Sequence, residues 1–103
     1  MTGLVGDQIS QGDAAGQARV AALNALAAAA DVAGGVNNIR RVVRVVVYVA
    51  SAADFTAQPA VANGASEMLG EIFGDAGRHI RSAIGVASLP LGAPVKVELT
   101  VQV

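Results

Sequence analysis

Hydrophobic positions recur along the chain with two periods, one of three to four residues and one of two. Between 13 and 33 the longer period gives an apolar stripe, begun by Asp13 as a capping residue and ended by the pair Gly34-Gly35. The same spacing returns between 58 and 73. We therefore expect two helices with these bounds, and a loop over residues 1–12, where no period is present.

The two-residue period marks three further segments that are rich in β-branched residues. Residues 40–50 predict a central strand, and the runs 79–88 and 95–103, joined by the sequence LPLGAP, predict a β-hairpin. The order α-β-α-β-β contains one β-α-β crossover, which favours a mixed sheet with both helices on a single face. We expect an α+β fold and a single domain over residues 1–103.

Such a hairpin would decide where two charged side chains lie. In 95–103 the apolar residues occupy every second position, and Glu98 lies among the polar ones. In 79–88 the larger apolar residues share one face, and Arg81 lies on the other. If the apolar faces of the two strands match, Arg81 and Glu98 fall on the same face of the hairpin. The sequence thus predicts a basic and an acidic group converging on one surface.

The composition limits both the core and the partners of the chain. Hydrophobic residues make up 53% and aromatic residues only 3%, so small aliphatic side chains must fill the core. A small chain with a mean hydropathy of +0.53 is expected to cover apolar surface in contacts between subunits. The net charge is −1, and no aromatic residues interleave Arg40, Arg41 and Arg44, so a nucleic-acid surface is not predicted.

Several classes of site and location are not expected from this sequence. It has no cysteine, which excludes disulfides and thiolate chemistry. No apolar run is long enough to cross a bilayer, and the N-terminus shows no export signal. We therefore expect a cytoplasmic protein with no membrane partner.

Arg81 is the first candidate for a binding residue. Its guanidinium is a rigid fork that matches a carboxylate, and the small residues Ser82, Ala83 and Gly85 leave room beside it. The alternative is an ordinary surface arginine or an ion pair across the hairpin. Glu98 is a candidate base toward water, and the alternative is a solvated carboxylate on the polar face of its strand.

His79 is the only histidine and precedes Arg81 by two residues. A general acid, a ligand, and a capping or surface residue are the roles open to it. No second residue of metal-binding type lies at a ligand spacing from it, so no metal site is predicted.

Three segments of the chain resemble the YjgF/RidA family. They are QARVAALNALAAA (17–29), VVVYVASAADF (45–55) and GRHIRSAIGVASLPLGAPVKVEL (77–99). The last segment is the most specific. The residues that carry the resemblance are Gln17, Asn24, Asp54-Phe55, Arg81-Ser82, Leu89-Pro90 and Glu98.

The resemblance implies a chorismate-mutase-like fold and a homotrimer with clefts between its subunits. It also implies cofactor-free hydrolysis of reactive enamine or imine intermediates that pyridoxal-phosphate enzymes release. In such proteins the arginine matched by Arg81 binds the substrate carboxylate, and the glutamate matched by Glu98 positions or activates the attacking water. Asn63 matches a family asparagine of the second helix, and Ala83, which leaves room beside Arg81, is expected to border the substrate.

The sequence also departs from the family pattern. The family begins with two or three strands that bear a tyrosine and a Ser-Gly pair of the cleft, whereas TGLVGDQIS (2–10) resembles the loop after them. Either the start is truncated or this version lacks part of the pocket. Two functions stay open: an imine deaminase, and a non-catalytic trimer that binds small carboxylates or ketoacids. A ribonuclease has no basic aromatic patch to support it.

Overall fold

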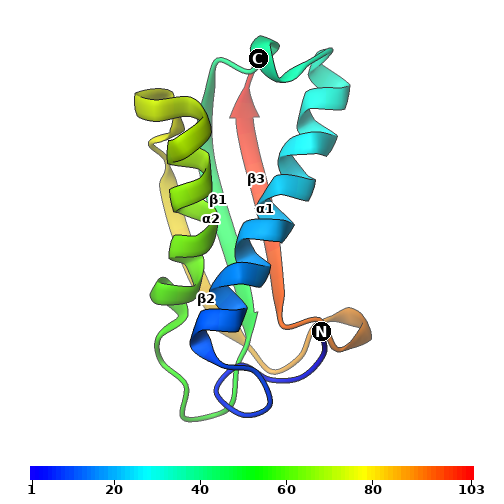
Figure 1. Ribbon diagram of the computed structural model, residues 1–103, viewed down its shortest axis with the longest axis vertical. Coiled ribbons are helices and arrows are strands. Elements are labelled where there is room, and N and C mark those ends of the chain that lie inside the picture. The colour runs from blue at the N-terminus through cyan, green and yellow to red at the C-terminus, as the bar shows by residue number, and fades with distance from the viewer.

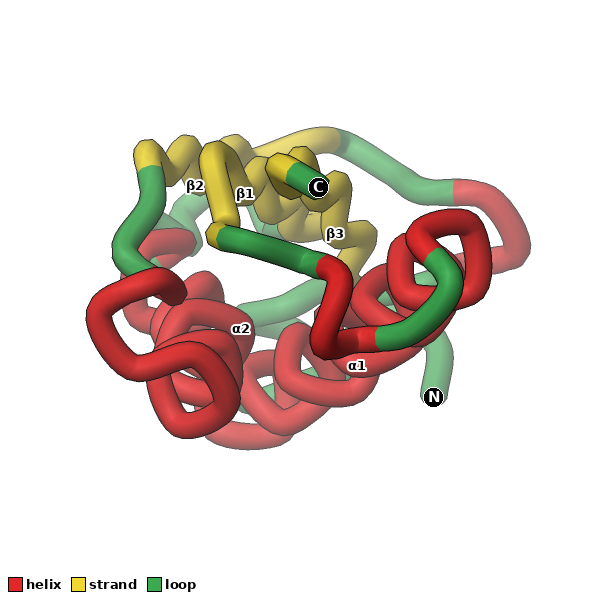
Figure 2. The backbone as a smooth tube through the Cα atoms, turned by 90° about the horizontal axis from the view of Figure 1, so that it is seen from above, coloured by secondary structure: helices red, strands yellow, loops and turns green.

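The computed structural model describes residues 1–103 as two layers, one of helices and one of strands. The main elements are α1 (Gln11–Ala33), β1 (Arg41–Ala50), α2 (Gln58–Phe73), β2 (Ile80–Val86) and β3 (Val95–Gln102). Both helices lie in front of the sheet in Figure 1, and the view along the layers shows them on one side of it (Figure 2). The other face of the sheet carries no helix, and we call it the open face.

The sheet has the order β2-β1-β3, with β2 parallel and β3 antiparallel to β1. This confirms the α+β fold, the mixed sheet and the central position of the strand predicted over 40–50. The predicted hairpin is wrong, because β1 lies between the two strands that would have formed it. The connection over residues 89–94 is long enough to pass the end of one strand, since two strand spacings amount to about 10 Å.

The first helix begins before the residue that we expected to cap it. Ser10 is the N-cap, and its hydroxyl oxygen accepts a hydrogen bond of 3.1 Å from the backbone N–H of Asp13. The segment before the helix is a loop, as expected, but it is not peripheral. Val5 and Ile9 are buried in the core, and the backbone N–H of Val5 donates to Ala50 at the end of β1. The loop is therefore attached to the central strand.

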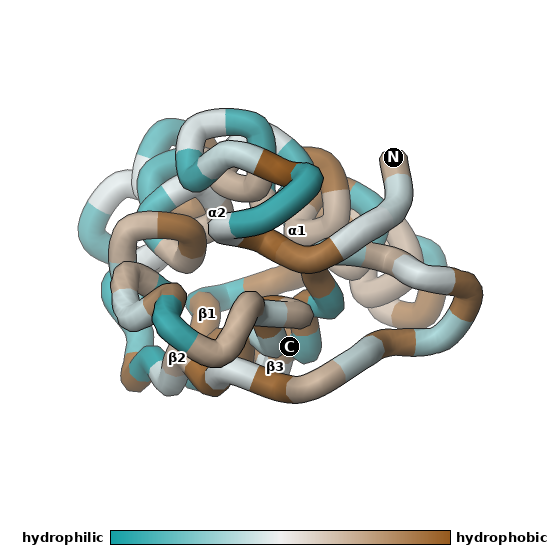
Figure 3. Tube along the Cα trace, turned by 90° about the horizontal axis from the view of Figure 1, so that it is seen from below, coloured by the Kyte–Doolittle hydropathy of each residue, from teal (hydrophilic) through white to brown (hydrophobic).

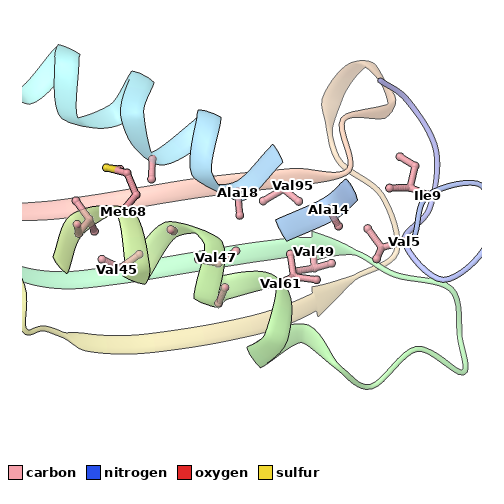
Figure 4. Packing of buried hydrophobic residues seen from close by; sticks show 14 of the residues in the cluster. Val5, Ile9, Ala14, Ala18, Val45, Val47, Val49, Val61, Met68 and Val95 are labelled. Carbon is pink, nitrogen blue, oxygen red and sulfur yellow. The ribbon is translucent and has the colours of Figure 1, made fainter. Parts of the chain in front are cut away.

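Small aliphatic side chains fill the space between the two layers, as the composition predicts. Val45, Val47 and Val49 point from β1 toward the helices, and Figure 4 shows Ala14, Ala18, Val61 and Met68 packing against them. The tube coloured by hydropathy shows brown residues along the strands and teal residues on the outer turns of α2 (Figure 3). No aromatic residue belongs to the buried cluster. Such a core lets helix backbones approach closely.

Gly64 is where this close approach is tightest. A Cβ atom placed on Gly64 would overlap the backbone oxygen of Ala15, so the backbones of α1 and α2 touch at this point. Since Gly64 lies within α2, the contact also fixes the position of the two polar residues on either side of it, Asn63 and Ser66.

An ion pair joins the two helices at their outer surface. Arg19 of α1 donates to both carboxylate oxygens of Glu71 of α2, at 3.3 and 2.8 Å. The hydrogen bond and the charge of Arg19 hold the pKa of the Glu71 carboxyl below its ordinary value of 4.5. Because the carboxyl pKa is lower in the folded than in the unfolded protein, the ion pair stabilises the fold at pH values above the unfolded-state pKa. This contribution is lost as the pH falls through the folded-state pKa.

We therefore predict that Arg19→Gln raises the pKa of Glu71 toward its ordinary value. A pH titration of the Glu71 side chain by NMR measures this directly, and Arg40→Gln is the matched control because Arg40 takes part in no ion pair. An unchanged Glu71 titration in Arg19→Gln would show that the ion pair does not form in solution.

Neither helix combines the length and the apolar character that a membrane crossing requires.

Candidate functional site

Arg81 lies on the helix-covered face of the sheet, on the edge strand β2. Its register partner on β1 is Val45, which is buried under the helices, and paired residues of neighbouring strands point to the same face. Because β2 has no neighbour on its outer side, the Arg81 side chain reaches past the edge toward α2 and remains exposed. The edge position thus combines a fixed backbone with an accessible guanidinium.

Two neutral groups of α2 hold one end of this guanidinium. Nη1 donates to Oδ1 of Asn63 at 2.6 Å and lies 3.5 Å from Oγ of Ser66. Nε and Nη2 have no acceptor in the chain, and none of the ion pairs of the structure includes Arg81. The positive charge is therefore not neutralised, and one edge of the fork stays free to bind an anion in bidentate geometry.

The small residues beside Arg81 on β2 have a packing role. Ala83 is half-buried against the core, and a Cβ on Gly85 would meet the side chain of Gln58 on α2. The face of β2 with small residues is therefore the one that α2 covers, and the face with Ile80 and Ile84 is open. Sequence reasoning assumed the reverse, that the larger apolar residues of this strand would face the core.

Glu98 consequently lies on the opposite face of the sheet from Arg81, and the predicted convergence of these two residues is wrong within one chain. Glu98 pairs with Val46 of β1, whereas Arg81 pairs with Val45, and successive residues of a strand point to opposite faces. The error follows from the face assigned to β2, whose larger apolar residues were expected on the same side of the sheet as those of β3.

On the open face, Glu98 has partners of its own. One carboxylate oxygen lies 3.4 Å from Nζ of Lys96, and the other accepts a hydrogen bond of 3.4 Å from the hydroxyl of Tyr48. Nζ of Lys96 lies 5.5 Å from the centre of the Tyr48 ring. These long, exposed contacts leave the carboxylate accessible to another molecule.

The other predicted residues gather around Arg81. Asn63 binds it directly, and Ala83 lies two residues further along the same face of β2. The His79 imidazole is half-buried just before β2, where Nε2 lies 2.9 Å from Oγ of Ser66 and Nδ1 lies 2.5 Å from the carbonyl oxygen of Gly77.

Sequence reasoning missed Ser66, which lies between Arg81 and His79. The signal was available, because Asn63 and Ser66 are three residues apart on a helix that was correctly predicted, and such residues share a face. Two neighbouring polar side chains on a helix covering a sheet indicate a polar contact with that sheet.

The surface around Arg81 is open. None of the hollows in the surface of the chain is lined by Arg81, Asn63, Ser66, His79 or Glu98. The largest is lined only by apolar residues of α1 and β3 and by Val103, which follows β3. One chain alone therefore presents the Arg81 group as an exposed cluster, and a closed binding site at this place needs a second surface.

Residues 2–103 match the family described as "YjgF/chorismate_mutase-like, putative endoribonuclease". The chain belongs to this family. The match confirms the resemblance read from the Arg81 and Glu98 segments.

Individual relatives agree with this assignment. The chain is 40% identical over 103 residues to Protein TCP17 of Trypanosoma cruzi, covering 99% of this chain and 64% of that protein. The crystal structure of Atu1372 from Agrobacterium tumefaciens, a protein of unknown function, has a TM-score of 0.96 at 38% identity over 100% of this chain and 66% of that one. A structure titled a putative endoribonuclease, from Shewanella oneidensis MR-1, has a TM-score of 0.95 at 28% identity over 99% of this chain and 68% of that one.

The chain thus spans about two thirds of the length of these relatives. The structural neighbours share the arrangement of two helices on a three-stranded mixed sheet.

Proposed function

We propose that the protein hydrolyses small 2-imino acids, the reactive products that some pyridoxal-phosphate enzymes release, to 2-oxo acids and ammonia without a cofactor. The observation that carries the proposal is the guanidinium of Arg81, which neutral groups hold at Nη1 while its Nε and Nη2 edge has no partner. A 2-imino acid carries a carboxylate directly next to its C=N carbon. Binding the carboxylate at this edge holds the reacting carbon next to the side chains of α2.

Arg81 and Glu98 lie on opposite faces of the sheet, and this placement has a consequence for how copies of the chain assemble. A site that contains both residues needs Glu98 from another copy of the chain, because in one chain the sheet separates them. We therefore propose a homotrimer whose subunits meet through the open face of the sheet. On this face Ile80 is 69% exposed and Ile84 is also exposed, although both are large apolar side chains.

We predict that Ile84→Glu reduces the trimer to a monomer, because it places a charge in the apolar part of the open face. Sedimentation velocity at micromolar concentration measures the mass. Val32→Glu is the matched control, since Val32 is 90% exposed at the end of α1, on the helix side of the molecule. A monomeric wild type, or a loss of the trimer in Val32→Glu alone, would contradict the assignment of the open face as the interface.

Ammonia release from 2-iminobutanoate, generated in situ by an amino-acid oxidase, tests the reaction. The expected result is a rate that is proportional to protein concentration and exceeds the uncatalysed hydrolysis. A wild-type rate equal to the uncatalysed one would rule out the deaminase.

A non-catalytic trimer that binds small carboxylates or ketoacids is the second candidate. The same free edge of Arg81 supports it, since carboxylate binding needs only the guanidinium. Calorimetric titration with 2-oxobutanoate separates the two candidates: binding without ammonia release from the imine would favour the second. The words "putative endoribonuclease" describe the family and the Shewanella protein, and we do not propose this activity for the present chain.

A further inference from the structure

The hydrogen bonds of His79 determine which of its ring nitrogens carries a proton and which accepts one. The carbonyl oxygen of Gly77 can only accept, so Nδ1 of His79, 2.5 Å away, carries a proton. In the neutral imidazole, Nε2 then has a free lone pair. Ser66, whose Oγ lies 2.9 Å from Nε2, must donate its hydroxyl proton to it.

The fold holds both partners of this hydrogen bond in place. Gly77 is buried in the turn after α2, and a Cβ on it would lie 2.6 Å from the backbone oxygen of Leu69. The turn therefore packs directly against the helix that carries Ser66, and the carbonyl that orients the imidazole cannot move independently of it. Ser66 and His79 are both half-buried, so they are ordered and still accessible from the surface.

The same hydroxyl also faces the guanidinium. Nη1 of Arg81 lies 3.5 Å from Oγ of Ser66, whose lone pairs can accept from it while its proton goes to His79. The order of donors is thus Arg81 to Ser66, Ser66 to His79, and His79 to the carbonyl of Gly77. A hydroxyl between a cation and an imidazole lone pair is placed to pass a proton to the imidazole.

We propose that Ser66 and His79 are the proton-transfer pair of the carboxylate site, with His79 as the base and Ser66 as the relay. This inference rests on the proposed function and deepens it, because it assigns the acid–base chemistry of imine hydrolysis to residues next to Arg81. Within one chain Glu98 lies on the other face of the sheet with Lys96 and Tyr48, so Ser66 and His79 are the proton-carrying groups that the same chain places beside Arg81.

Hydrolysis begins with the attack of a water molecule on the substrate. The oxygen of a water bonded to Ser66 forms a bond to the iminium carbon, and the π electrons of the C=N bond move to nitrogen. One proton of that water passes through Oγ of Ser66 to Nε2 of His79. The imidazolium then returns a proton to the amino nitrogen, a lone pair of the hydroxyl oxygen forms the C=O bond, and the C–N bond breaks with its electron pair leaving on ammonia. The remaining hydroxyl proton passes to His79 and then to the ammonia, which gives the 2-oxo acid and ammonium.

The first test reads the imidazole directly. His79 is the only histidine of the chain, so a two-bond ¹⁵N–¹H correlation spectrum of the uniformly labelled protein contains a single imidazole. The expected pattern at a pH where the ring is neutral is the tautomer with the proton on Nδ1. The tautomer with the proton on Nε2 would overturn the proposal, because Ser66 would then have no lone pair to donate to.

The second test is kinetic and uses ammonia release from 2-iminobutanoate. His79→Gln and Ser66→Ala are expected to lower kcat by about 100-fold with little change in KM, because Arg81 still binds the carboxylate. Ser88→Ala is the control, since Ser88 is an exposed serine after β2 and away from this cluster. Calorimetric titration with 2-oxobutanoate shows whether each variant is folded and still binds.

The outcomes separate this proposal from the proposed function. An active wild type together with a His79→Gln variant of full kcat would overturn the proton-transfer pair alone. An inactive wild type would overturn the deaminase, and the assigned role of His79 with it.

Discussion

Arg81→Lys is expected to lower kcat/KM for 2-iminobutanoate by about 100-fold, which corresponds to about 2.7 kcal/mol of transition-state binding. Lysine keeps the positive charge but has no planar fork, so it cannot bind a carboxylate through two parallel hydrogen bonds while a third N–H holds Asn63. Steady-state ammonia release measures the effect. Most of the loss is expected in KM, because the carboxylate is bound in the ground state as well.

Arg78→Lys is the matched control for this variant. Arg78 lies three residues earlier, is exposed, and contacts only Asp75 at 3.8 Å. It should leave kcat/KM unchanged. Equal losses in both variants would mean that replacing an arginine at this end of the molecule lowers activity without regard to its position, and that the free edge of Arg81 does not bind substrate.

The largest effect on stability is expected from Gly64→Ala. A methyl group at this position overlaps the backbone oxygen of Ala15, so α1 and α2 must move apart or bend, at a cost of about 3 kcal/mol. Urea unfolding followed by circular dichroism measures the loss. Because Asn63 and Ser66 flank Gly64 on α2, the same substitution should weaken carboxylate binding at Arg81.

Gly70→Ala is a control of opposite sign in the same helix. Nothing lies within 4 Å of a Cβ at Gly70, so alanine there should stabilise the protein by about 0.5–1 kcal/mol through helix propensity and the unfolded chain. If both substitutions stabilised the protein, the close contact between the helices would not exist in solution.

The sequence predicted where the helices and strands lie along the chain better than which strands lie side by side in the sheet. The helix over Gln58–Phe73 and the central strand were found because three- to four-residue and two-residue periods are local properties of the chain. Which strands lie side by side is not local. The runs before and after LPLGAP are adjacent in sequence, yet the crossover through α2 places β2 on one side of β1 and leaves the other side for β3.

The face of β2 was misjudged for a related reason. Judged from the strand sequence alone, the large apolar residues Ile80 and Ile84 are expected to face the core, and the small residues Ala83 and Gly85 are expected to face away from it. Under a closely packed helix the small residues face the core, as the contact of Gly85 with Gln58 shows. Large apolar residues then remain on the open face. The composition predicted contacts between subunits but did not indicate which surface makes them.

The candidate site was only partly accessible from the sequence. The family resemblance named both Arg81 and Asn63 as site residues, and the structure places them in hydrogen-bond contact although they are 18 residues apart. Ser66 and the orientation of His79 depend on side-chain directions in the middle of α2 and after the turn that follows it, and no sequence period specifies these directions. Local sequence patterns determine which helix or strand carries a side chain, and tertiary packing determines what that side chain contacts.

The central claim is that the free Nε and Nη2 edge of Arg81 binds the substrate carboxylate. The most direct measurement is the NMR signal of the Nε–H group of Arg81, assigned by its loss in Arg81→Lys, during a titration with 2-oxobutanoate. We predict a saturable downfield shift of this proton, with a dissociation constant equal to that from calorimetry. Saturable binding that leaves the Arg81 signal in place, or no binding at all, would contradict the claim.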